Sequence, residues 1–264
     1  MEASLIEMQG TLDVLQHETV IIIPAYNERR RIKGVLDEAA GFISSHCLPW
    51  KVIVSIDGDD GTDRIVDSYA TVFPFISHIQ GSGRSGKGNA IKRAAFTMSE
   101  YVVIMDADGS ITFSEIVRNM KVLQNYDAVI LSRYSPVNEI PVLRRFLSRG
   151  FNALVQALTG LRVKDTQSGY KIFKGEIFRK AITSVGVSNT FYDISLLWHI
   201  KRSGGRIVEI PTKYEHKDGS KFHPIGEVIG QGTSLIAFII RHSRFFRYVP
   251  RSLVNLYYRK FRWI

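Results

Sequence analysis

The feature that most constrains the fold is an alternation of short apolar runs with amphipathic segments in the first half of the chain. The apolar runs, which are rich in β-branched residues and predict buried strands, occupy residues 20–23, 52–56, 101–105 and 128–131. The segments between them, which predict helices, occupy residues 28–45, 62–73, 87–98 and 114–124. Strands that alternate with helices predict an α/β fold with a mostly parallel sheet and helices on both faces.

The pattern changes from about Pro141 onward. Apolar residues recur at helical spacing from about residue 143 to 158, and Arg144, Arg145 and Arg149 fall between them. This is a basic amphipathic helix, typical either of ordinary packing or of a lipid-facing element. A helix over 191–202, a strand over 206–210 and a helical segment after Ile225 are also predicted.

Polar clusters follow three of the predicted strands directly. They are Pro24-Ala25-Tyr26-Asn27-Glu28, Asp57-Gly58-Asp59-Asp60-Gly61-Thr62 and Asp106-Ala107-Asp108-Gly109-Ser110. A single Asp-x-Asp is more often a cap or a turn, but ligands of α/β sheets bind at the carboxyl ends of the strands. Carboxylates gathered at one edge repel each other unless a cation lies among them. The clusters therefore predict a divalent metal, Mg²⁺ or Mn²⁺, which also binds diphosphate oxygens.

A glycine-rich loop over residues 81–88 precedes the third predicted helix. Its Gly81-x-x-x-x-Gly86-Lys87 spacing is similar to that of a Walker phosphate loop, but Gly88 stands where Ser or Thr is required. A P-loop NTPase is therefore disfavoured. Glycines and a lysine at a helix start still predict an anionic or closely approaching ligand.

Charge and composition narrow the class of partner. The net charge is +10, and residues 241–264 hold seven Lys and Arg side chains, no Asp or Glu, and seven aromatic side chains. A basic aromatic segment predicts either nucleic acid or an anionic phospholipid surface as the partner. The single cysteine, Cys47, excludes an internal disulfide and a Cys-rich zinc module. No apolar run is long enough to span a bilayer, and the acidic N-terminus is unlike a signal peptide.

The order of these motifs resembles the family 2 glycosyltransferases of the GT-A fold. The order is Pro-Ala-Tyr-Asn-Glu, an Asp-Gly loop, Gly-Lys-Gly and Asp-Ala-Asp. Later motifs narrow the resemblance to the polyprenyl-phosphate hexose synthases, which include the dolichyl-phosphate mannose synthases and dolichyl-phosphate glucosyltransferases. These motifs are Ser132-Arg133-Tyr134, residues 165–171 (Asp-Thr-Gln-Ser-Gly-Tyr-Lys), Phe191-Tyr192-Asp193 and Ser220-Lys221. The resemblance covers roughly residues 19–225.

The resemblance implies a role for each matching residue. Those implied to bind the nucleotide are Pro24, Tyr26, Glu28, Asp57, Lys87 and Asp106. Asp106 and Asp108 would bind the metal against the diphosphate. Those implied to bind phosphate groups or the acceptor are Arg133, Gln167, Ser220 and Lys221, with Gln167 lining the sugar site. Asp108, Arg133 and Asp193 are the predicted catalytic residues.

The chain departs from the family pattern at two places. Ile56-Asp57-Gly58-Asp59 replaces the usual Asp-Asp-Gly-Ser, so the first of the paired acids is missing, and Ser195 replaces the Glu of the usual Phe-Asp-x-Glu-Leu motif. Asp193 is retained, and a carboxylate there suits the base that a hydroxyl acceptor needs. A phosphate acceptor needs little general-base help, because its second pKa is about 6 and it is already largely ionised at neutral pH.

The sequence therefore predicts inverting transfer of a hexose, from GDP-mannose or UDP-glucose, to a polyprenyl phosphate. The expected site is the cytoplasmic face of a membrane, with the protein bound peripherally at an anionic surface. The expected organisation is an N-terminal extension over 1–18, a GT-A domain over 19–225 and a basic membrane-proximal segment over 226–264. The alternatives are transfer to a saccharide or other hydroxyl acceptor, an inactive relative that only binds nucleotide sugars, and a nucleic-acid-binding protein. Nucleic acid is not expected, because no nucleic-acid-binding motif accompanies the charge.

Overall fold

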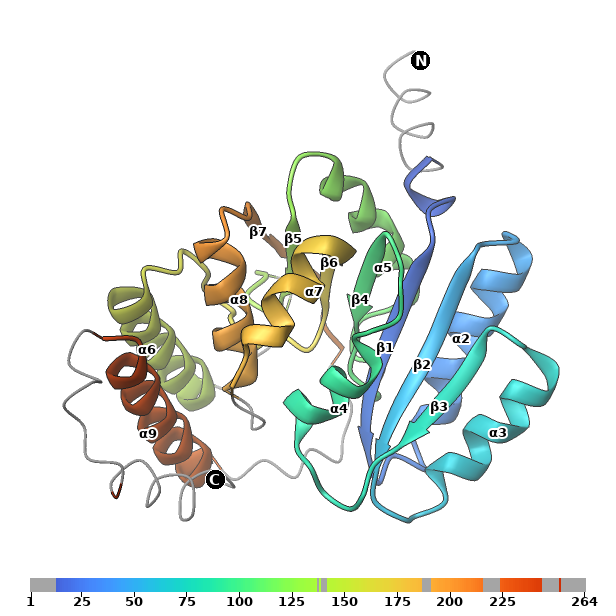
Figure 1. The fold of residues 1–264 in the computed structure, drawn as a ribbon, viewed down its shortest axis with the longest axis horizontal. Helices are drawn as coiled ribbons and strands as arrows, with labels where there is room; N and C mark the ends of the chain where they lie inside the picture. The colour runs from blue at the N-terminus through green and yellow to red at the C-terminus, as the bar shows by residue number, and fades with distance from the viewer. Residues whose placement is uncertain are drawn as a thin grey trace.

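A single twisted sheet of seven strands forms the centre of the molecule in the computed structural model, which describes residues 13–136, 138, 142–186, 191–215, 224–243 and 252 (Figure 1). The strands are β1 (Thr19–Tyr26), β2 (Trp50–Asp57), β3 (Ile76–Gln80), β4 (Tyr101–Ile104), β5 (Ala128–Ser132), β6 (Lys171–Lys174) and β7 (Ile207–Pro211). Their order across the sheet is β3-β2-β1-β4-β6-β5-β7. Only β6 among these strands runs antiparallel to its neighbours, so the sheet is mostly parallel, as predicted.

Helices cover both faces of the sheet. The helices are α2 (Ile32–Ser45), α3 (Thr62–Val72), α4 (Lys87–Ala94), α5 (Phe113–Met120), α6 (Val142–Thr159), α7 (Gly175–Ser184), α8 (Tyr192–Arg202) and α9 (Pro224–His242), with a short 3₁₀ helix over Lys121–Gln124. Buried side chains of α2, α3 and α5 pack in one apolar cluster, and those of α4, α6, α7, α8 and α9 pack in a second.

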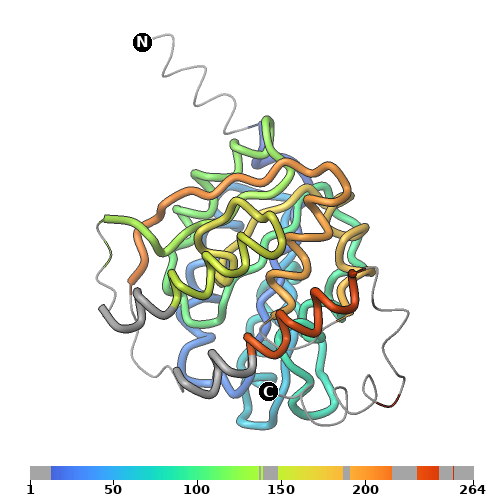
Figure 2. Tube along the Cα trace, turned by 90° about the vertical axis from the view of Figure 1, so that its left-hand side faces the viewer, coloured from blue at the N-terminus to red at the C-terminus, as the bar shows by residue number. Residues whose placement is uncertain are grey.

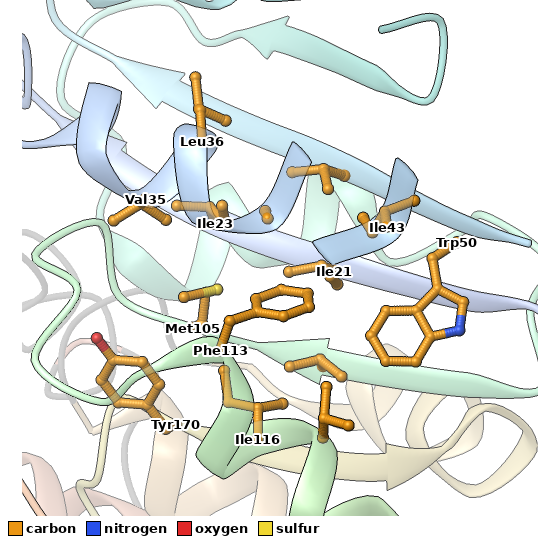
Figure 3. Close-up of a cluster of buried hydrophobic side chains, with 14 of the residues drawn as sticks. Ile21, Ile23, Val35, Leu36, Ile43, Trp50, Met105, Phe113, Ile116 and Tyr170 are labelled. Carbon is orange, nitrogen blue, oxygen red and sulfur yellow. The ribbon is translucent and has the colours of Figure 1, made fainter. Parts of the chain in front are cut away.

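The sequence of β1 is apolar without alternation because both faces of the strand are buried. Ile21 and Ile23 belong to the cluster beneath α2 and α5, whereas Val20 and Ile22 belong to the cluster on the other face. Figure 3 shows Ile21 and Ile23 packed between side chains of α2 and the ring of Phe113. A parallel strand covered on both faces is buried on both, which removes the period-two pattern.

The polar clusters lie where the parallel strands end, along the side of the sheet that is here called the polar edge. The carboxyl ends of β1, β2, β4 and β5 lie at this edge because these strands are parallel to one another. The antiparallel strand β6 begins at the same edge, with Lys171 opposite Ile104 of β4 and Ile130 of β5. The turn that precedes β6 is thereby placed between the residues that follow β4 and β5.

The structure contains each predicted strand and helix and adds three elements that the pattern did not predict. The predicted helix over 87–98 is shorter, because α4 ends at Ala94, and the predicted helix over 114–124 continues after Met120 as a 3₁₀ helix. The predicted helix over 28–45 begins at Ile32, because residues 28–31 form a hydrogen-bonded turn. The added elements are β3, β6 and α7. The four residues of β6 have a lysine at each end, so no apolar run marks the strand, although three of the four side chains are buried.

Candidate active site

Two aspartates follow β4 at the polar edge of the sheet, as predicted. Asp106 accepts a hydrogen bond from the Lys87 ammonium, with 2.6 Å between Nζ and Oδ1. Asp108 Oδ1 accepts hydrogen bonds from the Ser110 backbone N–H at 3.0 Å and from the Tyr170 hydroxyl at 2.9 Å. Both carboxylates are therefore oriented before any ligand binds.

The turn before β6 approaches Asp106 closely. Gly169 lies so near this carboxylate that a Cβ atom at position 169 would collide with Oδ2. Only glycine permits this approach of backbone to side chain. The register of β6 against β4 sets the contact, since Lys171 is opposite Ile104 and Gly169 therefore lies beside Asp106.

The Lys87–Asp106 ion pair stays charged in the folded protein. Burial disfavours the ammonium, but the nearby carboxylates of Asp106 and Asp193 outweigh it and raise the pKa of Lys87. Burial also disfavours the Asp106 carboxylate, yet Lys87 holds its pKa below the ordinary value.

Asp57 has a different environment from the one its predicted role requires. It is buried, and its Oδ2 accepts the Ser85 backbone N–H at 2.7 Å while its Oδ1 lies 2.6 Å from Arg93 Nη2. A Cβ at Gly81 would collide with both Asp57 and Arg93. Asp57 thus fastens the glycine-rich loop to the end of β2, and a nucleotide-binding role for its carboxylate stays a prediction.

The last residues of β1 and the turn that follows it border the same edge. Pro24 is half-buried, and Tyr26 is 41% exposed with the Arg84 guanidinium 4.8 Å from its ring centroid. Glu28 forms a bidentate ion pair with Arg31, at 2.7 and 2.5 Å. Burial is the main cause that raises the pKa of Glu28, and the charges of Asp106 and Asp108 add to it. Glu28 therefore lies within electrostatic reach of both aspartates.

Arg133 follows β5 and is paired with Asp165, a residue of the 165–171 motif to which the sequence assigned no role. Its Nε and Nη2 donate to Asp165 at 3.0 and 2.7 Å, and its backbone N–H donates to the same carboxylate at 2.9 Å. Asp165 is fully buried, whereas the Arg133 side chain is 24% exposed. The Coulomb attraction of Arg133 outweighs the burial of Asp165 and lowers its pKa. The guanidinium is therefore fixed in orientation, and the side chain is not fully buried.

Lys171 and Asp193 form a second fixed pair beneath the site. Lys171 Nζ lies 2.5 Å from Asp193 Oδ1, and the Lys171 ammonium also donates to the Ser168 carbonyl. Neither side chain is exposed by more than 4%. Burial lowers the pKa of Lys171, and the attraction of Asp193 opposes this. Asp193 is thus held by a neighbouring cation and covered from solvent, which does not suit the base that a hydroxyl acceptor needs.

The remaining predicted residues are placed unevenly. Gln167 is half-buried in the turn that carries Asp165 and Gly169. Ser220 and Lys221 lie outside the described residues, so their predicted contact with phosphate stays a prediction.

Sequence reasoning did not assign roles to several residues that build the site. They are Arg31, Ser85, Arg93, Asp165, Tyr170 and Lys171. Asp165, Tyr170 and Lys171 stand in a motif that the resemblance had already singled out. Arg93 is a half-buried residue of the amphipathic helix α4, and nothing in the helical pattern distinguishes it from other basic residues.

Comparison with known proteins identifies the family. Residues 20–183 match the Glycosyl transferase family 2 domain. A dolichyl-phosphate beta-glucosyltransferase of Trichomonas vaginalis is 30% identical over 238 residues, which are 84% of this chain and 73% of that protein. The polyprenol monophosphomannose synthase of Mycolicibacterium smegmatis is 29% identical over 212 residues, which are 76% of this chain and 78% of the relative.

A solved structure shares the fold. The glucosyl-3-phosphoglycerate synthase of Mycobacterium tuberculosis, solved with Mn²⁺, UDP-glucose and phosphoglyceric acid, superposes with a TM-score of 0.61 at 16% identity. The match covers 89% of this chain and 82% of that one. The predicted GT-A fold is confirmed.

Proposed function

This chain belongs to glycosyl transferase family 2, and from that premise we propose that it transfers a hexose from a nucleotide sugar to a polyprenyl phosphate. The two relatives described above carry names for transfer of glucose and of mannose to such lipids. The observation that carries the proposal is the contrast along one sheet edge. Asp106 and Asp108 follow β4, and the guanidinium of Arg133 follows β5. The turn that precedes β6 lies between them.

The donor set fits a hard divalent cation. Asp106 and Asp108 offer carboxylate oxygens, and across the described parts of the chain no cluster of three or more His, Cys, Asp or Glu residues suits a metal. Mg²⁺ and ions like it are commonly held by one or two carboxylates together with substrate phosphates, so two aspartates suffice. Such an ion would stabilise the negative charge of the departing diphosphate. We propose that Asp106 and Asp108 hold it.

The donor nucleotide would lie between the ends of β1 and β2. Tyr26 offers an exposed ring for stacking, and Lys87 and Arg84 bring positive charge from the loop that Asp57 fastens. Helix α4 begins at Lys87, so its first N–H groups face the same edge and favour an anion. We propose that these groups orient the diphosphate and its sugar.

On the acceptor side, the phosphate itself is the nucleophile. A phosphate oxygen forms a bond to the anomeric carbon, and the bond from that carbon to the diphosphate oxygen breaks, with its electron pair leaving on the diphosphate. A single displacement of this kind inverts the anomeric centre. Because the phosphate is already ionised, the site needs a cation to hold it and not a base. Arg133 supplies the cation, and the Lys171–Asp193 pair positions the turn that carries Gln167 and Gly169.

The test is a donor and acceptor panel. Radiolabelled UDP-glucose and GDP-mannose would each be incubated with the full chain, Mn²⁺ or Mg²⁺, and either polyprenyl phosphate or a free oligosaccharide. Label in an organic-extractable product only with the lipid phosphate, and loss of that label with EDTA, is the expected result. Label transferred to the oligosaccharide but not to the lipid phosphate would replace this proposal with a hydroxyl acceptor.

We further propose that an anionic membrane surface carries the acceptor to the site. Helices α6 and α9 lie side by side at one end of the molecule (Figures 1 and 2). Each presents two exposed aliphatic side chains one turn apart. These are Leu154, Leu158, Ile236 and Ile240. Arg149 and Arg241 are exposed on the same two helices. Apolar side chains flanked by arginines suit a phospholipid interface, where each basic residue contributes about 1 kcal/mol.

The predicted boundary between residues 225 and 226 falls inside helix α9. The helix begins at Pro224, and Leu235 and Phe238 are buried in the cluster that includes α8. The predicted segment 226–264 thus starts within a helix that packs on the catalytic domain, and residues 244–251 and 253–264 lie outside the described residues. None of the described helices has the length and apolar character that crossing a bilayer demands.

Vesicle co-sedimentation separates the two membrane-binding segments. One variant changes the four exposed aliphatic residues to Ser, and another ends the chain after Ser243. We expect both to bind vesicles containing phosphatidylserine less well than the full chain, and to keep activity on a water-soluble short-chain acceptor. Equal binding by all three chains would remove both segments from membrane attachment.

A further inference from the structure

The ammonium of Lys87 binds Asp106, one of the two carboxylates proposed to hold the metal. It lies 2.6 Å from Asp106 Oδ1, and both side chains remain partly open, at 23% and 36% exposure. The pair is therefore within reach of a ligand entering from solvent. It joins the first residue of α4 to the residue that follows β4 and Met105.

The two oxygens of the Asp106 carboxylate have different neighbours. Oδ2 faces Gly169 so closely that a side chain at position 169 would not fit. Oδ1 is the oxygen that Lys87 holds, so a cation that binds Asp106 through Oδ1 meets the ammonium there. A divalent cation and an ammonium at the same oxygen repel each other strongly in a partly buried site.

Asp108 is arranged differently. Its Oδ1 accepts from two neutral donors, the Ser110 N–H and the Tyr170 hydroxyl. Neutral donors orient a carboxylate without cancelling its charge, so Asp108 stays attractive to a cation throughout. The two aspartates therefore differ in kind: one is held by neutral donors, and the other is shared with a resident cation.

The backbone around Lys87 is fastened while its side chain is long and flexible. Ser85 is held on Asp57 through its backbone N–H and its hydroxyl, and Arg93 binds Asp57 from within α4. Moving the ammonium from Asp106 to a nearby phosphate therefore requires only rotation of the Lys87 side chain. A nucleoside diphosphate beside this loop supplies such an anion.

We propose that Lys87 competes with the divalent cation for Asp106, and that the diphosphate of the donor relieves this competition by drawing the ammonium away. Metal and nucleotide then strengthen each other's binding through one side chain. The coupling is reciprocal, because the effect of nucleotide on metal affinity must equal the effect of metal on nucleotide affinity. This inference rests on the proposed donor site and adds a mechanism by which that site loads metal and donor together.

The test measures binding and needs no acceptor. Mn²⁺ would be titrated onto the full chain and onto Lys87→Met, with free Mn²⁺ followed by electron paramagnetic resonance, first alone and then with saturating UDP or GDP. We expect Lys87→Met to bind Mn²⁺ alone about fivefold more tightly or better, a factor within the usual range of coupling between sites. Its gain in Mn²⁺ affinity on adding nucleotide should be smaller than that of the parent chain.

Matched variants keep the test decisive. Lys33→Met removes a lysine that pairs with Asp37 on the surface of α2, and it should leave Mn²⁺ affinity unchanged. Lys87→Arg keeps a positive charge and should keep the competition. If circular dichroism shows that Lys87→Met does not fold, Lys87→Gln takes its place. Mn²⁺ affinity that is unchanged or lower in the folded uncharged variant, or an unchanged effect of nucleotide, would overturn the proposal.

The result is independent of the acceptor. Coupling through Lys87 in a chain that labels no polyprenyl phosphate would leave this inference standing and overturn the proposed acceptor. Lipid labelling without coupling would do the reverse.

Discussion

In the half of the sheet formed by β1, β2 and β4 the two aspartates proposed to bind metal stay partly open, whereas around β5 and β6 the charged side chains are paired with buried carboxylates. Asp106 and Asp108 lie shortly after β4, and both are half-buried. In the other half, Arg133 pairs with the buried Asp165, 32 residues away, and Lys171 pairs with Asp193, 22 residues away. The first half keeps the carboxylates of Asp106 and Asp108 partly open, although its buried Asp57 is paired with Arg93, and the second half holds both of its cations on buried carboxylates.

In the proposed mechanism, this difference lets one site handle two phosphate-bearing reactants. The donor half, around Asp106 and Asp108, would keep its charges available, because the metal and the diphosphate enter and leave in each cycle. The acceptor half, around Arg133, would need a cation that stays in place, and the buried Asp165 keeps Arg133 oriented.

The largest effect is expected in the donor half. Asp108→Asn should lower transfer by at least about 100-fold, because metal stabilisation of the leaving group is worth several kcal/mol and each 1.36 kcal/mol is tenfold in rate. Steady-state rates with labelled donor provide the measurement, and Asp37→Asn on the surface of α2 is the matched control. A rate within a few-fold of the parent would make Asp108 a turn residue.

A large effect on stability is expected in the acceptor half. Lys171→Met leaves Asp193 charged and buried without its partner, which should lower the free energy of unfolding by about 3–5 kcal/mol. The double variant Lys171→Met/Asp193→Leu removes both charges and should recover much of that loss. Urea unfolding of the single and double variants measures both. If Lys171→Met is as stable as the parent, the pair does not fix this half of the site.

Arg133 should distinguish the two halves kinetically. Arg133→Ala should lower kcat/KM for the lipid phosphate by about 10- to 100-fold, since a hydrogen bond to a charged group is worth about 1.5–3 kcal/mol. Nucleotide affinity, measured by calorimetry, should change less. Arg133→Lys keeps the charge but not the fork and should lie between the parent and Ala. Lost nucleotide affinity with an unchanged dependence on acceptor would move Arg133 to the donor half.

The smallest effect concerns the contact of α8 with α9. Burial lowers the pKa of His199 and of His242, which lie with ring centroids 5.7 Å apart, and nearby arginines lower both further. The unfolded chain therefore binds protons more readily than the folded one. Stability should be complete above about pH 6.5, the ordinary pKa of histidine, and decline as the pH falls through the lower folded values. Thermal unfolding between pH 7.5 and 5 measures this, and His199→Gln should reduce the decline. If the parent and His199→Gln lose stability equally as the pH falls, burial of the neutral His199 ring does not cause the decline.

Sequence patterns alone predict the alternation of strands and helices, the mostly parallel sheet and the acidic residues at the strand ends. These features are local, because hydrophobic period and the residue that follows a strand are written in consecutive positions. The family motifs added the expectation of a sugar transfer, and the family is confirmed.

The partners of the charged residues, in contrast, depend on the tertiary fold. Nothing in the local pattern marks β6 as a strand or shows that it returns antiparallel between β4 and β5. That return places Gly169 against Asp106 and Lys171 beside Asp193. Likewise, Asp57 ends β2, where an exposed ligand would be expected, yet Arg93 on α4 and Ser85 enclose it. Ion pairs of this kind depend on which segments the sheet brings together, and a charge in the sequence carries no mark of the partner that folding will give it.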